Sequence, residues 1–203
     1  MKFKNIAIFS ILTIALITGC DEKKKIEESD IVTNNTKTEQ KQETKENKPF
    51  TFNLVTSNGK DLKIIADMKN GWEFVGHENK VVLLDFFGTW CPPCKAEIPH
   101  LNNIRGKLKE DFEIIGIDVG QRGGGLTPAE ELTQFIKDFK IKYPVTSGAD
   151  NGILFSAVSE LNPSGSIPFM ILFNKQGQFV RYYVGMKPEE MLMKDIEAAI
   201  KMK

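Results

Sequence analysis

The sequence predicts an α/β fold with a mixed central sheet flanked by helices. Residues 81–87 and 112–119 form two near-continuous apolar runs, which are typical of central strands covered on both faces. A segment of helical periodicity follows each run, and two more apolar segments flank a turn at 174–177. Strands and helices therefore alternate until a hairpin and a helix close the chain, which favours an α/β sandwich.

The N-terminal part of the domain is expected to add a β-hairpin. Residues 50–55 alternate apolar with polar side chains, 57–60 form a turn, and 62–66 can return as a second strand. The later expected elements are strands 81–87, 112–119, 143–146, 169–173 and 178–184, and helices at about 93–108, 127–140, 153–160 and 188–202. The helix at 127 has a threonine as its expected cap, followed by Pro128 and by Glu130 at the third position.

Residues 1–20 have the features of an export signal. Lys2 and Lys4 precede an apolar segment at 6–17, which is too short to cross a hydrocarbon core of about 30 Å. The segment ends in small residues followed by Cys20, a pattern that resembles the bacterial lipobox. That resemblance implies cleavage before Cys20 and lipidation of this cysteine, so the chain is expected to be anchored to the cell membrane and to face the periplasm or extracytoplasmic space.

Residues 21–48 are nearly all charged or polar and contain no aromatic side chain. Such a segment cannot bury enough apolar surface to offset its ordering entropy, so it is predicted to be a disordered tether. As a flexible coil it would span roughly 30 Å. Residues 49–203 remain as one domain, since about 155 residues suit a single core.

Charge and cysteine content narrow the function classes. The 27 basic and 27 acidic residues balance, so no nucleic-acid partner is expected. If Cys20 is lipidated, the pair Cys91 and Cys94 is the only one left in the domain. A structural zinc site would need more ligands than this pair, and His77 and His100 lack zinc-finger spacing. A disulfide across so short a loop adds little stability, so neither a metal site nor a structural bridge is favoured.

Redox chemistry explains the CPPC pair better. A buried strand ends just before it, so Cys91 should stand at the start of a helix, where free N–H groups and the helix dipole favour a thiolate. Cys94 lies about one turn later and can resolve a mixed disulfide formed by Cys91. Pro92 and Pro93 suit the opening turn of a helix. Asp85 lies inside the preceding apolar strand, where burial should raise its pKa and allow proton exchange with Cys94.

The segment VVLLDFFGTWCPPCKAEIPHL resembles the active site of thioredoxin-fold proteins. It is most similar to the membrane-tethered TlpA/ResA branch, which carries Trp-Cys-x-x-Cys followed by Glu-x-Pro. The resemblance implies a thioredoxin-like fold with an N-terminal hairpin extension and an extracytoplasmic thiol–disulfide oxidoreductase with no cofactor beyond its redox-active disulfide. It further implies a disulfide-bearing exported protein as substrate, apocytochrome c during cytochrome c maturation among them, and a membrane electron donor of the DsbD/CcdA type.

The resemblance also assigns roles to single residues. Asp85 matches the buried acid of thioredoxin, although the TlpA/ResA branch more often has asparagine there, and Glu97 matches the active-site glutamate of the ResA group. Trp90 would flank the attacking sulfur. Pro168 would be the cis-proline facing the cysteines, with Ile167 contacting substrate. The competing interpretations are an aspartate bonded to backbone, a solvated helix glutamate and a tryptophan in the core.

Three alternatives to a reductase fit the sequence less well. A DsbA-like disulfide oxidase usually carries a helical insertion, whereas the segment after residue 119 predicts only a loop and one helix. A peroxiredoxin would need a Pro-x-x-x-Thr-x-x-Cys motif, which is missing. A lipoprotein that binds a partner without redox chemistry would leave the CPPC pair idle. The sequence therefore favours the reductase, with Cys91, Cys94, Asp85 and Glu97 as its catalytic residues.

Overall fold

The computed structural model describes residues 48–202. The expected export signal, the lipidation site Cys20 and all of the expected tether except Lys48 lie outside these residues. Within 48–202, none of the helices combines the length and the apolar character that a membrane crossing requires.

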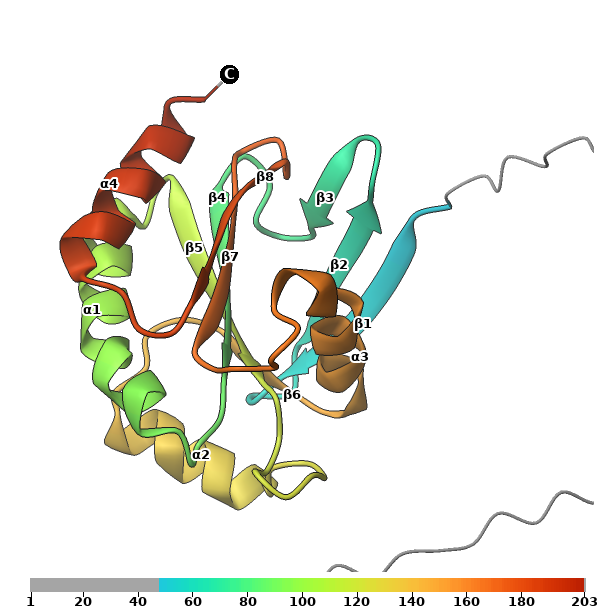
Figure 1. The fold of residues 1–203 in the computed structure, drawn as a ribbon, viewed down its shortest axis with the longest axis vertical. Helices are drawn as coiled ribbons and strands as arrows, with labels where there is room; N and C mark the ends of the chain where they lie inside the picture. The colour runs from blue at the N-terminus through green and yellow to red at the C-terminus, as the bar shows by residue number, and fades with distance from the viewer. Residues whose placement is uncertain (1–47, 203) are drawn as a thin grey trace, which may run out of the picture. The chain divides into compact units, whose positions relative to one another are not determined.

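One eight-stranded mixed sheet forms the centre of the domain (Figure 1). Its strands are β1 (Phe50–Thr56), β2 (Asp61–Asp67), β3 (Gly71–Phe74), β4 (Val81–Phe87), β5 (Phe112–Asp118), β6 (Val145–Ser147), β7 (Phe169–Phe173) and β8 (Phe179–Val184). They lie in the order β3-β2-β1-β6-β5-β4-β7-β8. Strand β5 runs parallel to β4 and β6, whereas the other neighbouring pairs are antiparallel. The predicted N-terminal hairpin is confirmed as β1 and β2, and β1 joins it to the main sheet through β6.

Helices cover both faces of the sheet (Figure 1). They are α1 (Pro92–Leu108), α2 (Ala129–Asp138), α3 (Ala149–Ala157) and α4 (Glu189–Ile200), with a short 3₁₀ turn at Ser159–Leu161. One hydrophobic cluster joins the sheet to α1, α2 and α4, and a second joins the opposite face to α3 and the N-terminal strands. The predicted α/β class, with a mixed central sheet flanked by helices, is therefore confirmed.

The central strand β4 determines which side chains face the active helix. Leu83 and Phe87 belong to the cluster on the α1 side, whereas Leu84 and Phe86 belong to the cluster on the α3 side. Because successive side chains of a strand point to opposite faces, Asp85 falls on the α1 side, the side from which the cysteines approach.

Three details differ from the prediction. Strand β3, which has four residues and begins at a glycine, was not predicted from the sequence. Helix α3 begins at Ala149 instead of 153, because its opening Asp-Asn-Gly has weak helix propensity and hides the start. The predicted threonine cap of α2 is wrong: Pro128 occupies the N-cap position without a capping side-chain bond, and the Thr127 side chain is buried.

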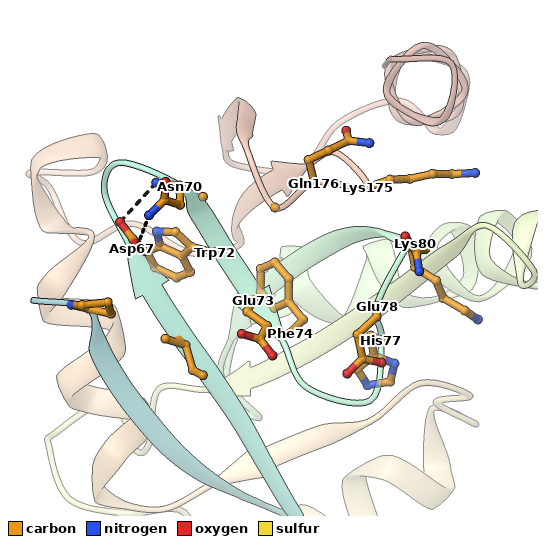
Figure 2. A pocket seen from close by; sticks show the side chains of 15 residues that line it. Asp67, Asn70, Trp72, Glu73, Phe74, His77, Glu78, Lys80, Lys175 and Gln176 are labelled. Carbon is orange, nitrogen blue, oxygen red and sulfur yellow. Dashed lines mark hydrogen bonds between the residues drawn. The ribbon is translucent and has the colours of Figure 1, made fainter.

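The missed strand β3 braces the turn between β7 and β8. The Trp72 N–H donates to the Gly177 carbonyl at 2.7 Å, and a Cβ on Gly177 would lie only 1.6 Å from the Trp72 carbonyl oxygen. Figure 2 shows the pocket of about 420 Å³ beside this contact, with Glu73 and His77 on one side and Lys175 on the turn. None of the residues that line it belongs to the cysteine site.

Candidate active site

The two cysteines lie at the start of α1, as predicted. Strand β4 ends at Phe87, and Cys91 occupies the N-cap of α1, so that Pro92 and Pro93 begin the helix. Cys91 and Cys94 form a disulfide with 5.3 Å between their Cα atoms. The Cys94 N–H donates to the Cys91 Sγ atom at 3.2 Å. After reduction the same N–H and the helix dipole would stabilise a thiolate on Cys91.

The cis-proline segment borders Cys91. The Ile167-Pro168 peptide bond is cis, as the family resemblance implied, and the Ile167 carbonyl oxygen lies 3.8 Å from the Cys91 Sγ atom. Gly88 leaves space for this arrangement, since a Cβ there would lie 2.8 Å from the Trp90 Nε1 atom and 3.3 Å from the Ile167 Cδ1 atom. Ile167 is half-buried, and its predicted role in contacting substrate stays a prediction.

Trp90 lies at the surface beside the disulfide. Its side chain is 36% exposed, which contradicts the interpretation of a core tryptophan. The indole Nε1–H donates to the Gly120 carbonyl at 2.9 Å, and the Arg122 guanidinium lies 5.7 Å from the centre of an indole ring. The loop after β5 therefore holds Trp90 in place as an aromatic platform next to Cys91.

Asp85 is buried at 3% exposure, in the middle of β4. The Tyr143 hydroxyl donates to its Oδ2 atom at 3.4 Å, whereas Oδ1 has no hydrogen-bond partner among the described residues. Burial raises the pKa of Asp85 to about 8; the nearby Glu97 carboxylate adds to this shift, and the Tyr143 hydroxyl opposes it. The alternative in which backbone groups bind Asp85 is not supported by any hydrogen bond in the described structure.

Glu97 is also buried, at 1% exposure, which contradicts the alternative of a solvated helix carboxylate. The Lys187 backbone N–H donates to its Oε1 atom at 3.0 Å, and Oε2 has no partner among the described residues. Burial raises the pKa of Glu97 to about 7, while the Lys187 N–H and the Lys187 charge oppose this shift. Helix α1 thus brings a second carboxyl group close enough to couple electrostatically to Asp85.

The comparisons with known proteins agree with this geometry. Residues 79–179 match a family model described as thioredoxin-like. The predicted thioredoxin-like fold is thereby confirmed. The thiol-disulfide oxidoreductase ResA of Halalkalibacterium halodurans is 30% identical over 121 residues, which are 59% of this chain and 62% of that protein. ResA of Bacillus subtilis is 29% identical over 142 residues, 70% of this chain and 68% of that protein.

Solved thioredoxin-like structures match the fold of this domain. A thiol:disulfide interchange protein from Chlorobium tepidum TLS matches with a TM-score of 0.59 and 23% identity, over 75% of this chain and 94% of that one. StoA from Bacillus subtilis matches with a TM-score of 0.52 and 19% identity, over 72% and 96%. The chain spans only about three fifths of curated relatives such as the ResA proteins of Halalkalibacterium halodurans, at 62%, and Bacillus cereus, at 61%.

The thioredoxin-like domain contains two site residues that the sequence analysis missed. Tyr143 contributes the hydroxyl on Asp85, and Lys187 contributes the N–H on Glu97. Neither lies near the CPPC segment in sequence, so no local motif marks them.

The part of the chain from 48 to 202 contains no cluster of three or more His, Cys, Asp or Glu side chains that could hold a metal ion.

Proposed function

We propose that the chain is an extracytoplasmic thiol–disulfide oxidoreductase that reduces disulfides of exported proteins. One observation carries the proposal: Cys91 lies at the N-cap of α1, where the Cys94 N–H reaches its sulfur, and forms a disulfide with Cys94. The resemblance to ResA proteins supports the same chemistry. A structural disulfide would not need a helix N-terminus and two buried carboxyl groups in the same domain.

The reaction follows from the positions of the two sulfurs. The reduced Cys91 thiolate attacks one sulfur of the substrate disulfide, and the other substrate sulfur leaves as a thiolate. Cys94 gives its proton to a nearby carboxylate, Asp85 in this proposal, and its thiolate attacks the Cys91 sulfur. The second substrate thiolate then leaves, and the Cys91–Cys94 disulfide forms. The protein has lost two electrons and the substrate has gained two.

The buried carboxyl groups favour the reductase direction over the DsbA-like oxidase. A dithiol becomes a strong oxidant when its reduced form is stabilised as a thiolate. Glu97 lies three residues after Cys94 on α1 and has a pKa of about 7, so the negative charge that it carries when ionised disfavours a thiolate beside it. The segment between β5 and β6 also contains only a loop and α2, without a helical insertion.

The reduction potential of the Cys91–Cys94 couple tests this direction. The full-length chain in detergent is equilibrated with dithiol buffers of known potential, and the oxidised fraction is measured by thiol labelling. We expect a value near or below roughly −270 mV, as for a reductant. A value near roughly −120 mV would mean an oxidase. If the cysteines did not exchange at all, the chain would be a binding module and the whole proposal would fail.

We further propose that the domain is anchored to the cell membrane by a lipid on Cys20, facing the periplasm or extracytoplasmic space. The small residues before Cys20 and the polar tether after it support this proposal. An apocytochrome c is one suitable substrate, and a DsbD/CcdA-type membrane protein would return the electrons.

Labelling of growing cells with a clickable fatty acid tests the anchor. The wild-type chain is expected to carry the label and to sediment with membranes, whereas Cys20→Ala should lose both properties. A label that persists in Cys20→Ala would exclude this lipidation site.

A further inference from the structure

The buried carboxyl groups of Asp85 and Glu97 have few hydrogen-bond donors. Asp85 receives one hydrogen bond from a side chain, and Glu97 receives one from backbone. In each carboxyl group the second oxygen is buried without a partner among the described residues. The Tyr143 hydroxyl is therefore the one side-chain donor that determines how Asp85 is held within residues 48–202.

The sheet is shaped to hold the Tyr143 ring in place. Asp85 pairs with Gly116 in the parallel ladder between β4 and β5. A Cβ on Gly116 would lie 3.3 Å from the Tyr143 Cε2 atom and 3.3 Å from the Phe87 Cε1 atom, so both rings lie against this glycine. The Gly116 N–H donates to the Pro144 carbonyl at 2.8 Å, which fixes the backbone just after Tyr143.

We propose that Tyr143, seated on Gly116, is a positioning residue of the redox site that holds Asp85 by its Oδ2 atom. Oδ1 then remains free of other described groups and is the oxygen that takes the Cys94 proton. This inference rests on the proposed function. The hydroxyl donates to the ionised carboxylate more strongly than to the neutral acid, so Tyr143 makes Asp85 easier to ionise. Tyr143 touches neither sulfur in this role and acts only through Asp85.

The other ionisable groups around Asp85 determine how its proton is shared. Glu97 faces it from α1, and its negative charge opposes ionisation of Asp85. Lys187, just before α4, favours the ionised form of Glu97. The sheet partners of Asp85 are the non-ionisable Gly116 and Met170. The pKa is about 8 for Asp85 and about 7 for Glu97. When the two carboxyl groups hold one proton between them, that proton therefore lies mainly on Asp85.

Tyr143→Phe tests this role in the full-length oxidised chain. Side-chain carboxyl ¹³C signals are followed against pH by NMR, and the reduced chain is assayed with oxidised glutathione over the same pH range. The titration midpoint of Asp85 is expected to rise by about one pH unit, the low end of the usual effect of losing a hydrogen bond to a charged group, because this bond is long at 3.4 Å. The acidic limb of the exchange rate should move by the same amount, since ionised Asp85 is required.

Tyr183→Phe is the matched control. Tyr183 is also buried, and its hydroxyl also donates to a carboxylate, Asp195, at 2.9 Å. This variant should lose stability in a similar way but leave the Asp85 midpoint unchanged. An unchanged midpoint in Tyr143→Phe, or an equal shift in Tyr183→Phe, would overturn the inference.

Two further variants separate the positioning role from a folding defect. Gly116→Ala keeps the hydroxyl but pushes the ring, so it should move the Asp85 midpoint in the same direction by a smaller amount. In an Asp85→Asn background, Tyr143→Phe should leave the pH–rate profile unchanged. The carboxyl titration needs no turnover, so a failure of this inference can be told apart from a failure of the proposed reductase activity.

Discussion

Replacing Cys91 with serine is expected to slow disulfide reduction by at least about 10³-fold. A serine hydroxyl cannot supply a thiolate at neutral pH, and loss of the nucleophile removes the first chemical step. The helix N-terminus and the Cys94 N–H would then have no thiolate to stabilise. The measurement is the rate of reduction of insulin by the pre-reduced chain, with thermal unfolding to confirm that the variant folds.

Cys94→Ser is the partner variant, and it should fail in a different way. Cys91 can still attack, so turnover stops after the first step and a mixed disulfide between Cys91 and the substrate accumulates. Non-reducing electrophoresis and mass spectrometry would detect this adduct and identify the cysteine that carries it. Two results with Cys91→Ser would contradict the proposed order of attack. One is a mixed disulfide between Cys94 and the substrate, and the other is substrate reduction that persists in this variant.

The sequence was sufficient for the parts of the fold that depend on local patterns. Continuous apolar runs identified β4 and β5, because strands buried on both faces need apolar side chains at every position. The turn chemistry before Cys91 and the prolines after it located the start of α1. The buried position of Asp85 could be anticipated because it interrupts an otherwise apolar run.

Contacts between residues far apart in the sequence could not be predicted from local sequence patterns. Tyr143 lies 58 residues from Asp85 and Lys187 lies 90 residues from Glu97, so only the packed structure reveals their hydrogen bonds. A buried tyrosine usually has a partner for its hydroxyl, but the sequence does not show which residue that partner is. Strand β3 was missed because a short edge strand is stabilised by its pairing with β2 and not by its own sequence.

Asp85→Asn is expected to stabilise the oxidised protein against unfolding and to slow thiol–disulfide exchange. Folding raises the pKa of Asp85 from 3.8 to about 8, because burial disfavours the charge. The stability that this group contributes is therefore fully present below its ordinary pKa and is lost as the pH rises toward 8. Asparagine has the same shape, cannot ionise and can still accept the Tyr143 hydrogen bond. The gain in the free energy of unfolding should grow from about 2 kcal/mol at pH 5 to about 5 kcal/mol at pH 8.

Urea unfolding of the oxidised chain at both pH values measures this gain, with the exposed Asp61→Asn as a control that should change little. A residual dependence on pH should remain in Asp85→Asn, because the pKa of buried Glu97 is also raised, to about 7. Exchange at neutral pH should fall by roughly 10²-fold, the usual effect of losing a general base. A variant that is more stable and slower would show that the buried carboxyl serves proton transfer at the expense of stability. A variant that is less stable at pH 8 would make Asp85 a structural residue and would leave proton transfer to Glu97.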